Sequence, residues 1–363
     1  MNRIWRHFDF MLLGTVLLLM MLGVAFVYSA TLGVESLGDA TTRQVMWAGA
    51  GLAVMLIVAA VDYRIWALVH WWVYGIILLL LGLLFLLGQV LGGAQGWFNA
   101  GLFFIQPAEL AKPLLVLSLA AMLAQHKDRL KHLIPVLGML AYILVPVVLI
   151  YLQPDLGGAV VILVVWAIMI WVAGLRPAHA GFLIVAGVLA IPAVWLNLAD
   201  YMRERLLPIL DPAQTPADVQ YMRDQALISI GSSTWLGKGF ASGSQSQLHF
   251  LRVRHTDFIF SIIVEEVGFI GAALTLALIA VLLWRILRIA RLARDDFGRL
   301  ICTGVAAVIF FQTVVNVGMN LALLPITGLT LPFISYGGSS LVTLLIGLGL
   351  VESVAMRQKL IEF

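Results

Sequence analysis

The chain has 363 residues, of which 62% are hydrophobic and only 11% are charged, and its mean hydropathy is +1.03. A soluble domain of this length needs a charged surface that this composition cannot supply, so the lipid bilayer is the expected solvent. The net charge of +3 argues against a nucleic-acid-binding surface, and the single cysteine, Cys302, excludes an intramolecular disulfide and a cysteine-based metal site.

Ten apolar segments are long enough to cross a membrane. They predict an all-α, polytopic integral membrane protein in which residues 1–363 form a single membrane domain. The first segment follows Arg3 and Arg6 and superficially resembles a signal peptide, but its length favours a retained span. The predicted transmembrane helices lie at about 10–29, 44–61, 67–89, 107–124, 133–151, 157–174, 178–197, 257–284, 300–321 and 338–355.

The basic residues predict the orientation of these helices. On one side of the predicted membrane, the short connections carry only Arg43. Cytoplasmic loops are enriched in Lys and Arg, so both termini are expected in the cytoplasm, with the chain in the inner membrane. The opposite side carries Arg3, Arg6, Arg64, Lys127, Arg129, Lys131, Arg176, Arg285, Arg288, Arg291, Arg294, Arg299, Arg357 and Lys359.

Two irregular segments are expected to carry function. The segment at about 198–256, between helices 7 and 8, is then a long extracytoplasmic loop, and it is too long for a simple connector. The segment 323–340 (LLPITGLTLPFISYGGSS) places Pro and Gly within apolar sequence. Irregular backbone at membrane depth is tolerated only where it is buried in protein or lines a cavity.

Polar residues gather at the predicted outer ends of helices 4 and 6. Gln106 precedes Pro107 at the start of helix 4, and Glu109 and Lys112 share one face of that helix. This pair is either a structural ion pair or a functional group in a cavity, and both interpretations can hold together. At the turn between helices 5 and 6, Asp155 either only stabilises the positive end of helix 6 or also contacts a ligand.

A second polar group opens helix 8. Asp257 follows His255 and Thr256, and it is either a helix-capping residue or a general base, because partial desolvation at such a boundary raises the pKa of a carboxyl group. Glu265 and Glu266 lie roughly 12 Å deeper at 1.5 Å per residue. We expect these two to be bundle-facing structural or gating groups. The sequence shows no phosphate-binding loop, metal-ligand cluster or Ser-His-Asp pattern.

Five segments resemble the SEDS family (shape, elongation, division, sporulation), and with the ten spans the resemblance covers essentially the whole chain. The third and fifth segments are more similar to the elongation branch, typified by RodA, than to the division branch, typified by FtsW. The segments are FIQPAELAK (104–112), QPDLGGA (153–159), GSQSQLHFL (243–251), RHTDFIFSIIVEEVGFIG (254–271) and LPITGLTLPFISYGGSS (324–340).

The resemblance implies a peptidoglycan glycosyltransferase that polymerises lipid II for cell elongation and rod shape, with a class B penicillin-binding protein as its transpeptidase partner. It implies that Asp257 is the essential carboxylate and that Glu109 and Lys112 line the same outer cavity. No metal-binding residue and no obligatory cofactor are expected, although a divalent cation (Mg²⁺ or Mn²⁺) is possible. The predicted substrate-binding residues are Glu109, Lys112, Gln106, Gln153, Asp155, His255 and Ser339.

Two departures from the family pattern concern local substrate contacts, not the reaction. Arg252 and Val253 stand where the family usually has Pro-Glu, and Gly96 replaces a basic residue beside Trp97. Two other functions remain as alternatives, a lipid II flippase and a non-catalytic membrane scaffold for a transpeptidase. A flippase is expected to have polar groups through the membrane midplane, and a scaffold would not need Asp257.

The hypothesis for the mechanism uses two lipid-linked substrates. The donor is the growing glycan on undecaprenyl pyrophosphate and the acceptor is lipid II. Asp257 would accept the proton of the acceptor 4-hydroxyl as it attacks the donor anomeric carbon, giving a β-1,4 linkage with inversion. Lys112, an Arg of the long loop or a divalent ion would neutralise the departing pyrophosphate. The lipid tails would lie in a groove between helices.

Overall fold

The computed structural model describes residues 7–34, 37–91, 94–99, 104–211, 214–248, 250–251 and 253–358. Within these ranges ten helices are long and apolar enough to cross a membrane, which confirms the prediction of an all-α polytopic membrane protein. They are α1 (Phe10–Thr31), α2 (Ala40–Ala60), α4 (His70–Leu87), α5 (Pro107–Gln125), α6 (Leu133–Tyr151), α7 (Leu156–Ala173), α8 (Pro177–Leu196), α12 (Ile259–Leu292), α13 (Asp296–Asn320) and α14 (Gly338–Ala355).

Short elements connect these spans. A small antiparallel sheet precedes α5, with strand order β1-β2-β3, and it was not predicted from the sequence. Three helices, α9 to α11, lie within the long connection between α8 and α12. The short elements are α3 (Tyr63–Leu68), β1 (Gln89–Leu91), β2 (Ala94–Asn99), β3 (Phe104–Ile105), η3 (Lys127–Lys131), α9 (Asp200–Leu210), α10 (Ala217–Gly231) and α11 (Ser244–Gln247).

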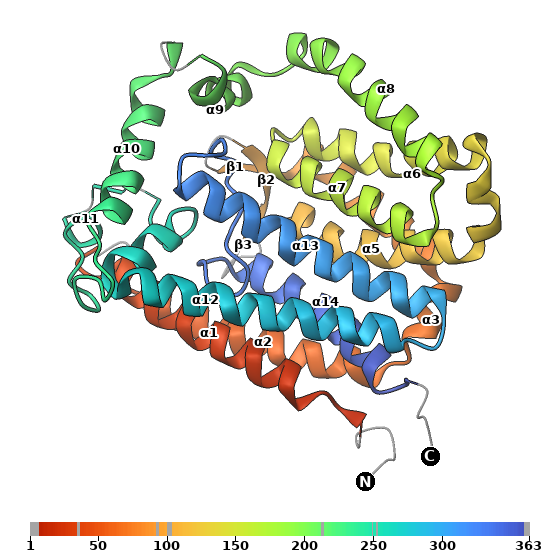
Figure 1. Cartoon of the computed structure of the whole chain (residues 1–363), viewed down its shortest axis with the longest axis horizontal. Helices are drawn as coiled ribbons and strands as arrows, with labels where there is room; N and C mark the ends of the chain where they lie inside the picture. The colour runs from red at the N-terminus through yellow and green to blue at the C-terminus, as the bar shows by residue number, and fades with distance from the viewer. Residues whose placement is uncertain are drawn as a thin grey trace.

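The centre of the bundle is formed by α5, α13 and α14, which are buried along most of their length. Around them, α2 packs on α14, α1 packs along α12, and α7 packs on α13 (Figure 1). Aspartates begin several helices: Asp9 accepts a hydrogen bond from the backbone N–H of Leu12 at the start of α1, and Asp295 accepts one from Gly298 at the start of α13. These carboxylates satisfy first-turn N–H groups that have no partner within the helix.

Both ends of the described chain lie at one end of the bundle, as the even number of spans predicts. Phe8 packs against Ala59 and Met356, and Arg285 of α12 forms an ion pair with Asp9 at 2.5 Å. We call this the terminal end. The other end, which carries α9 to α11, is called the loop end.

Helix α12 differs from the predicted helix 8. It begins at Ile259, extends to Leu292, and is broken at Gly268, where φ is 72° and ψ is −166°. A positive φ is readily adopted only by glycine. A Cβ atom on Gly268 would also lie 2.4 Å from the backbone nitrogen of Gly237, so both the conformation and the close approach require glycine here.

The segment Thr234–Gly239 satisfies the backbone groups that this break frees. The N–H groups of Phe269 and Ile270 donate to the carbonyls of Thr234 and Trp235, at 3.2 Å each. In return, the N–H groups of Lys238 and Gly239 donate to two carbonyls of α12 at 2.9 Å each. An irregular helix is tolerated at this depth because neighbouring backbone supplies the missing partners.

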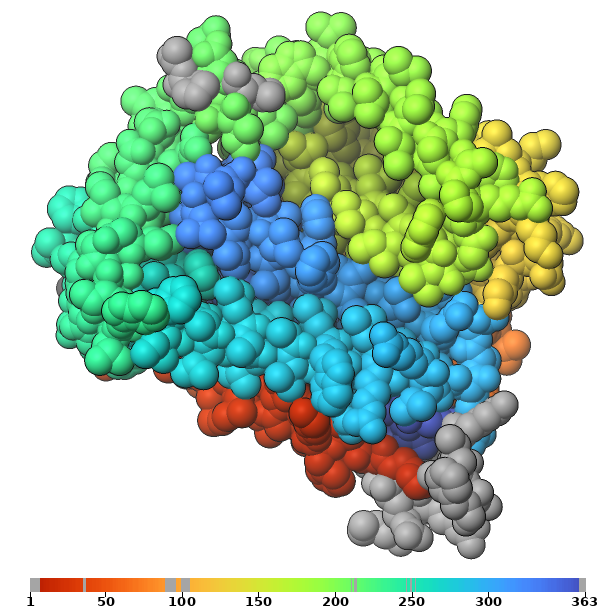
Figure 2. Space-filling view, in the orientation of Figure 1, coloured from red at the N-terminus to blue at the C-terminus, as the bar shows by residue number. Residues whose placement is uncertain are grey.

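Helix α8 stands away from the rest of the bundle. None of its residues is buried, and large apolar side chains such as Ile184, Leu189 and Leu196 are exposed on it. Figure 1 shows it connected at the loop end to α9, and Figure 2 shows the surface hollowed between α8 and the body formed by α7 and α13. A fully apolar helix with so little packing is stable only where lipid surrounds it.

Candidate active site

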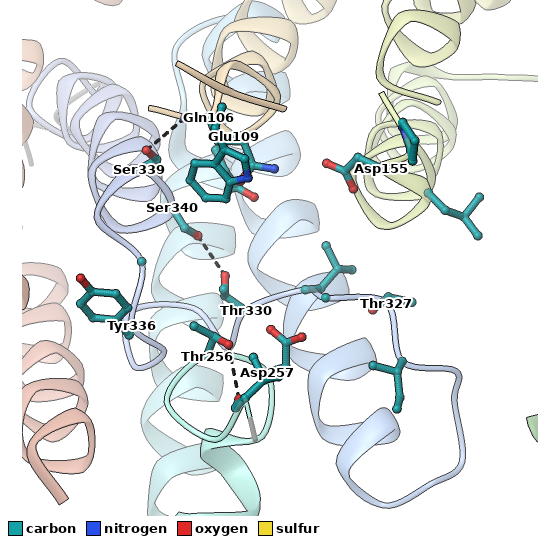
Figure 3. A pocket seen from close by; sticks show the side chains of 18 of the residues that line it. Gln106, Glu109, Asp155, Thr256, Asp257, Thr327, Thr330, Tyr336, Ser339 and Ser340 are labelled. Carbon is teal, nitrogen blue, oxygen red and sulfur yellow. Dashed lines mark hydrogen bonds between the residues drawn. The ribbon is translucent and has the colours of Figure 1, made fainter. Parts of the chain in front are cut away.

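A cavity of about 560 Å³ opens at the loop end of the bundle. This volume suits a sizeable ligand. Its wall is built from α2, β2, α5, α7, α9, the turn before α12, the irregular segment between α13 and α14, and the start of α14. Figure 3 shows the part of the wall that carries Glu109, Asp155 and Asp257. The charged and titratable side chains in this wall are Arg43, Glu109, Asp155, Tyr201, Arg205, His255, Asp257 and Tyr336.

Asp257 lies in the turn before α12 and faces the cavity (Figure 3). The prediction that Asp257 opens the helix is wrong, because α12 begins at Ile259. The alternative that Asp257 is only a capping residue is also wrong, because the N-cap residue is Phe258 and there is no side-chain capping hydrogen bond. Burial raises the pKa of the Asp257 carboxyl, while the Arg205 guanidinium and a hydrogen bond from Thr256 lower it. A carboxylate with a raised pKa in a cavity has the property of a general base.

Two buried asparagines of α13 fix the backbone of this turn. The side-chain amides of Asn316 and Asn320 both donate to the Asp257 carbonyl oxygen, at 3.0 Å each. Asn316 also donates to the Leu329 carbonyl at 2.8 Å, and Oδ1 of Asn320 accepts from the Ser261 N–H at 3.0 Å. The asparagines therefore bind the Asp257 turn, the first turn of α12 and the irregular segment together. The signal in the sequence that indicates them is a pair of Asn residues four apart in an apolar helix.

The irregular segment 321–337 lines the cavity, as expected for broken backbone at this depth. Its Ser335 hydroxyl donates to the Thr256 carbonyl at 2.6 Å, and the Tyr336 N–H donates to the His255 carbonyl at 2.9 Å. From α2, the buried Gln44 amide donates to the Ser335 carbonyl at 3.3 Å. These bonds hold the segment beside the turn that carries Asp257.

The residues predicted for the site at the start of helix 4, which is α5 in the structure, lie partly in the cavity wall and partly in the protein interior. Gln106 and Glu109 line the cavity, and the Gln106 N–H donates to the hydroxyl of Ser339, which also lines it, at 3.2 Å (Figure 3). Lys112 does not line it: its ammonium is one turn deeper, 3% exposed, and donates to Glu109 Oε1 at 2.6 Å. The structural interpretation of the pair is therefore confirmed. The direct substrate contact predicted for Lys112 has no support, because its side chain is nearly buried and is not part of the wall.

The two residues predicted at the turn before α7 also separate. Asp155 lines the cavity and caps α7, accepting from the Gly158 N–H at 2.7 Å, so both interpretations of this residue fit the structure. Burial raises the pKa of Asp155, and the Gly158 N–H and the Lys112 charge lower it. Gln153 lies outside the wall, buried, with its amide donating to the Leu81 carbonyl at 2.8 Å. It connects this turn to α4 and does not contact the cavity.

His255 lies in the wall with its ring 5.6 Å from the ring of Tyr336. Burial lowers the pKa of His255, and the neighbouring Arg254 charge lowers it further. The imidazole is therefore neutral at pH 7. Arg254 itself is buried and donates to the Ala30 carbonyl at the end of α1, so it supports the turn from behind.

Sequence reasoning missed the cation nearest to Asp257. Arg205 of α9 donates to the hydroxyl of Tyr201 and lies over its ring. A Cβ atom built on Gly328 would lie 3.5 Å from Nη1 of Arg205 and 3.9 Å from Oδ2 of Asp257. The guanidinium and the carboxylate thus both lie close to Gly328. An Arg of the long loop was among the expected cations, and the structure identifies which one reaches the cavity.

Glu265 and Glu266 are structural groups, as predicted, but much of their bonding is to the long connection. Lys238 donates to Glu265 at 2.8 Å. Ser29 of α1 donates to Glu266 at 2.5 Å, and so does the Ala241 N–H at 3.1 Å. The two carboxylates fasten the connection to the first turns of α12.

Among the described residues, no three His, Cys, Asp or Glu side chains lie together as a protein-held metal site would need.

Comparisons with known proteins give a consistent result. The sequence profile of the family described as "Cell cycle protein" (FtsW, RodA, SpoVE) matches residues 9–360. The chain is 34% identical to the peptidoglycan glycosyltransferase MrdB of Escherichia coli K12, over 98% of this chain and 95% of that protein. It is 35% identical to stage V sporulation protein E of Bacillus subtilis, over 96% of each.

Solved structures are similar over the whole length. One, described as a peptidoglycan synthase complex that coordinates polymerization and crosslinking, contains a chain with a TM-score of 0.81 and 34% identity, over 96% of this chain and 98% of that one. The rod shape determining protein RodA of Thermus thermophilus has a TM-score of 0.71 and 31% identity, over 97% of this chain and 98% of that one.

Proposed function

Because this chain belongs to the cell cycle protein family of FtsW, RodA and SpoVE and is a peptidoglycan glycosyltransferase, we propose that it polymerises lipid II into β-1,4-linked glycan for cell elongation and rod shape. The observation that carries the proposal is the position of Asp257, a carboxyl with a raised pKa that faces a large cavity and has Arg205 nearby. A base beside a cation is what this group transfer requires.

The proposed orientation places the terminal end in the cytoplasm and the cavity at the outer face of the cytoplasmic membrane. Basic residues in short connections support it. Arg64, Lys127 and Arg176 lie in short connections toward the terminal end, and Arg288 lies in the last turns of α12 at the same end. Toward the loop end, the described short connections and the helix ends beside them carry only Arg43, in the first turn of α2. Such asymmetry marks the cytoplasmic side of a membrane protein.

In the proposed reaction, the 4-hydroxyl of the acceptor lipid II approaches the anomeric carbon of the donor glycan. Asp257 accepts the hydroxyl proton as the new oxygen–carbon bond forms. The bond between the anomeric carbon and the pyrophosphate oxygen breaks, and the electron pair leaves with the pyrophosphate. Attack from the face opposite the α-linked leaving group gives a β linkage. A positioned base of this kind contributes about 10²–10⁴-fold in rate.

Arg205 is proposed to neutralise the charge that develops on the leaving pyrophosphate. It is the cation of the cavity wall closest to Asp257, and a guanidinium binds phosphate oxygens bidentately. Lys112 is proposed to act indirectly, by fixing the Glu109 carboxylate. That no cofactor is obligatory, and that Mg²⁺ or Mn²⁺ can accompany the pyrophosphate, stay predictions that activity assays with EDTA and added metal will test.

The hollow beside α8 supports a path for lipid tails. Apolar residues Leu156, Met202, Leu206 and Ile326 line the cavity on the α7 and α9 side, next to the space under α8 (Figure 2). A polyprenyl chain could remain in the bilayer there while its pyrophosphate and sugars occupy the polar cavity. We propose this hollow as the groove for one of the two lipid tails.

A class B penicillin-binding protein is proposed as the partner. The support is the similarity to a subunit of a complex described as coordinating polymerization and crosslinking. A lipid II flippase and a non-catalytic scaffold are the alternatives, and neither needs a base with a raised pKa. Incubating the purified chain and its transpeptidase partner with lipid II, and resolving products by length, tests the proposal. Glycan strands are expected; transport across vesicles without polymer would favour a flippase.

A further inference from the structure

Two cations line the cavity, and they come from different helices. Arg205 enters the wall from α9, and Arg43 enters it from the first turn of α2. These two helices lie on opposite sides of α13 and α14 (Figure 1). Within the described part of the chain, no other Lys or Arg lines the cavity.

The α2 end carries groups suited to a phosphorylated sugar. Arg43 is exposed, and its guanidinium forms no ion pair or hydrogen bond with the described residues. One turn further along α2, the Trp47 indole packs so closely on α14 that a Cβ atom on Gly338 would lie 2.3 Å from it. Ser339, next in the chain, also lines the cavity. An indole face contacts the apolar face of a ring, and a guanidinium binds phosphate.

The reaction itself requires two pyrophosphates at unequal distances from the base. In the donor, the pyrophosphate is bonded to the anomeric carbon under attack, so it lies next to the reacting atoms. In the acceptor, the attacking hydroxyl is on the outer sugar of the disaccharide, and the pyrophosphate is on the inner one. When that hydroxyl is at Asp257, the acceptor pyrophosphate is a disaccharide's length away.

We propose that the cavity binds two lipid pyrophosphates at once: Arg205 holds that of the donor, and Arg43 with Trp47 forms a separate site for the inner sugar and pyrophosphate of the acceptor. This inference rests on the proposed function. Arg205 and Asp257 both lie close to Gly328, as a ligand of the leaving group and the base must, whereas Arg43 enters the wall from α2, on the other side of α13 and α14 (Figure 1). The two substrates then reach the base from opposite sides of α13 and α14.

The test separates affinity for the acceptor from retention of the donor. Arg43→Gln should raise the lipid II concentration for half-maximal rate by about tenfold or more, because one charged hydrogen-bonding group is lost. At saturating lipid II, its maximal rate and glycan length should be normal. Arg205→Gln should lower the maximal rate at every concentration and shorten the glycan, because the growing chain is the donor and leaves early.

The matched control moves the charge by one residue. Thr42 is exposed on α2 and does not line the cavity, so the double variant Thr42→Arg/Arg43→Thr keeps the net charge but turns it away. It should behave like Arg43→Gln. If this variant has a normal lipid II concentration for half-maximal rate, the proposal is overturned, because the net charge of the protein and not the position of Arg43 would then attract lipid II. Short glycan from Arg43→Gln at saturating lipid II, with unchanged half-saturation, would also overturn it.

A binding measurement tests the inference independently of polymerisation. With Asp257→Asn as background, lipid II should bind with a stoichiometry of two, and adding Arg43→Gln should weaken one site while the other is unchanged. A single site, unaffected by Arg43→Gln, would contradict the two-site arrangement. Absence of glycan from the unmodified chain would instead refute the proposed function.

Discussion

Replacing Asn320 by alanine tests how the Asp257 turn is held in place. The Asn320 side chain donates to the Asp257 carbonyl at 3.0 Å and accepts from both the N–H and the hydroxyl of Ser261, at 3.0 and 2.6 Å. Truncation leaves the buried Ser261 N–H without an acceptor, which costs about 1–3 kcal/mol. Asn316 still donates to the Asp257 carbonyl, so the protein should fold with a free energy of unfolding lower by about this amount.

Activity should fall by more than the loss of stability explains. A displacement of about 1 Å at a reacting group can cost about 10²-fold in rate, so we expect kcat to fall about 10- to 100-fold. Because Asn320 does not line the cavity, the KM for lipid II should change little. The assay is the initial rate of lipid II polymerisation below the melting temperature of each variant. Ser261→Ala is the control, since it removes only the hydroxyl bond. A normal rate for Asn320→Ala would refute the idea that this clamp positions Asp257.

Three further predictions concern charge and topology. Lys112→Ala leaves the nearly buried Glu109 carboxylate unpaired, which should lower the free energy of unfolding by about 3–5 kcal/mol and lower activity. Lys112→Arg should not restore the activity. Full activity of the alanine variant would show that the ion pair is dispensable. The base form of Asp257 is lost as the pH falls through its raised pKa, and the Arg205 charge lowers that pKa. Arg205→Gln should therefore move the acid limb of the pH–rate profile to higher pH. An acid limb that does not move would contradict this coupling between Arg205 and Asp257. Gln214→Cys should react with an impermeant reagent from outside intact cells and Arg294→Cys should not, with the buried Cys302 silent; the reverse pattern would place the cavity on the wrong side.

Length and apolarity were sufficient to predict the ten spans, because a bilayer imposes both directly on the sequence. They could not predict that α8 stands away from the bundle, since a helix surrounded by lipid is as apolar as one packed in the centre. The break at Gly268 also escaped prediction. Its backbone partners lie in Thr234–Gly239, about thirty residues earlier, and no local pattern reports such a pairing.

Most of the predicted wall came from short motifs near helix starts, and Gln106, Glu109, Asp155, His255, Asp257 and Ser339 do line one cavity. The motifs could not say which neighbours face inward. Lys112 and Gln153 belong to the same motifs but point into the protein interior. Lys112 lies one helical turn after Glu109, and Gln153 lies next to the Pro154 of the wall. Arg205 was not singled out because it is one of several arginines in a long polar segment, where each looks like a solvated residue.

Polymerisation by Asp257→Asn is the most direct test of the proposed catalytic role of this carboxyl. The substitution keeps the size of the side chain and the backbone bonds from Asn316 and Asn320, and it removes the proton-accepting oxygen. Because the pKa of Asp257 is raised in the folded state, ionisation of this carboxyl opposes folding as the pH rises toward that value. The neutral amide of Asn at this position should therefore leave the stability at pH 7 unchanged or raise it. With purified lipid II and the transpeptidase partner, the account predicts a folded, partner-binding variant whose polymerisation rate falls by about two or more orders of magnitude. Glycan formation at a near-normal rate by this variant would contradict the assignment of Asp257 as the base.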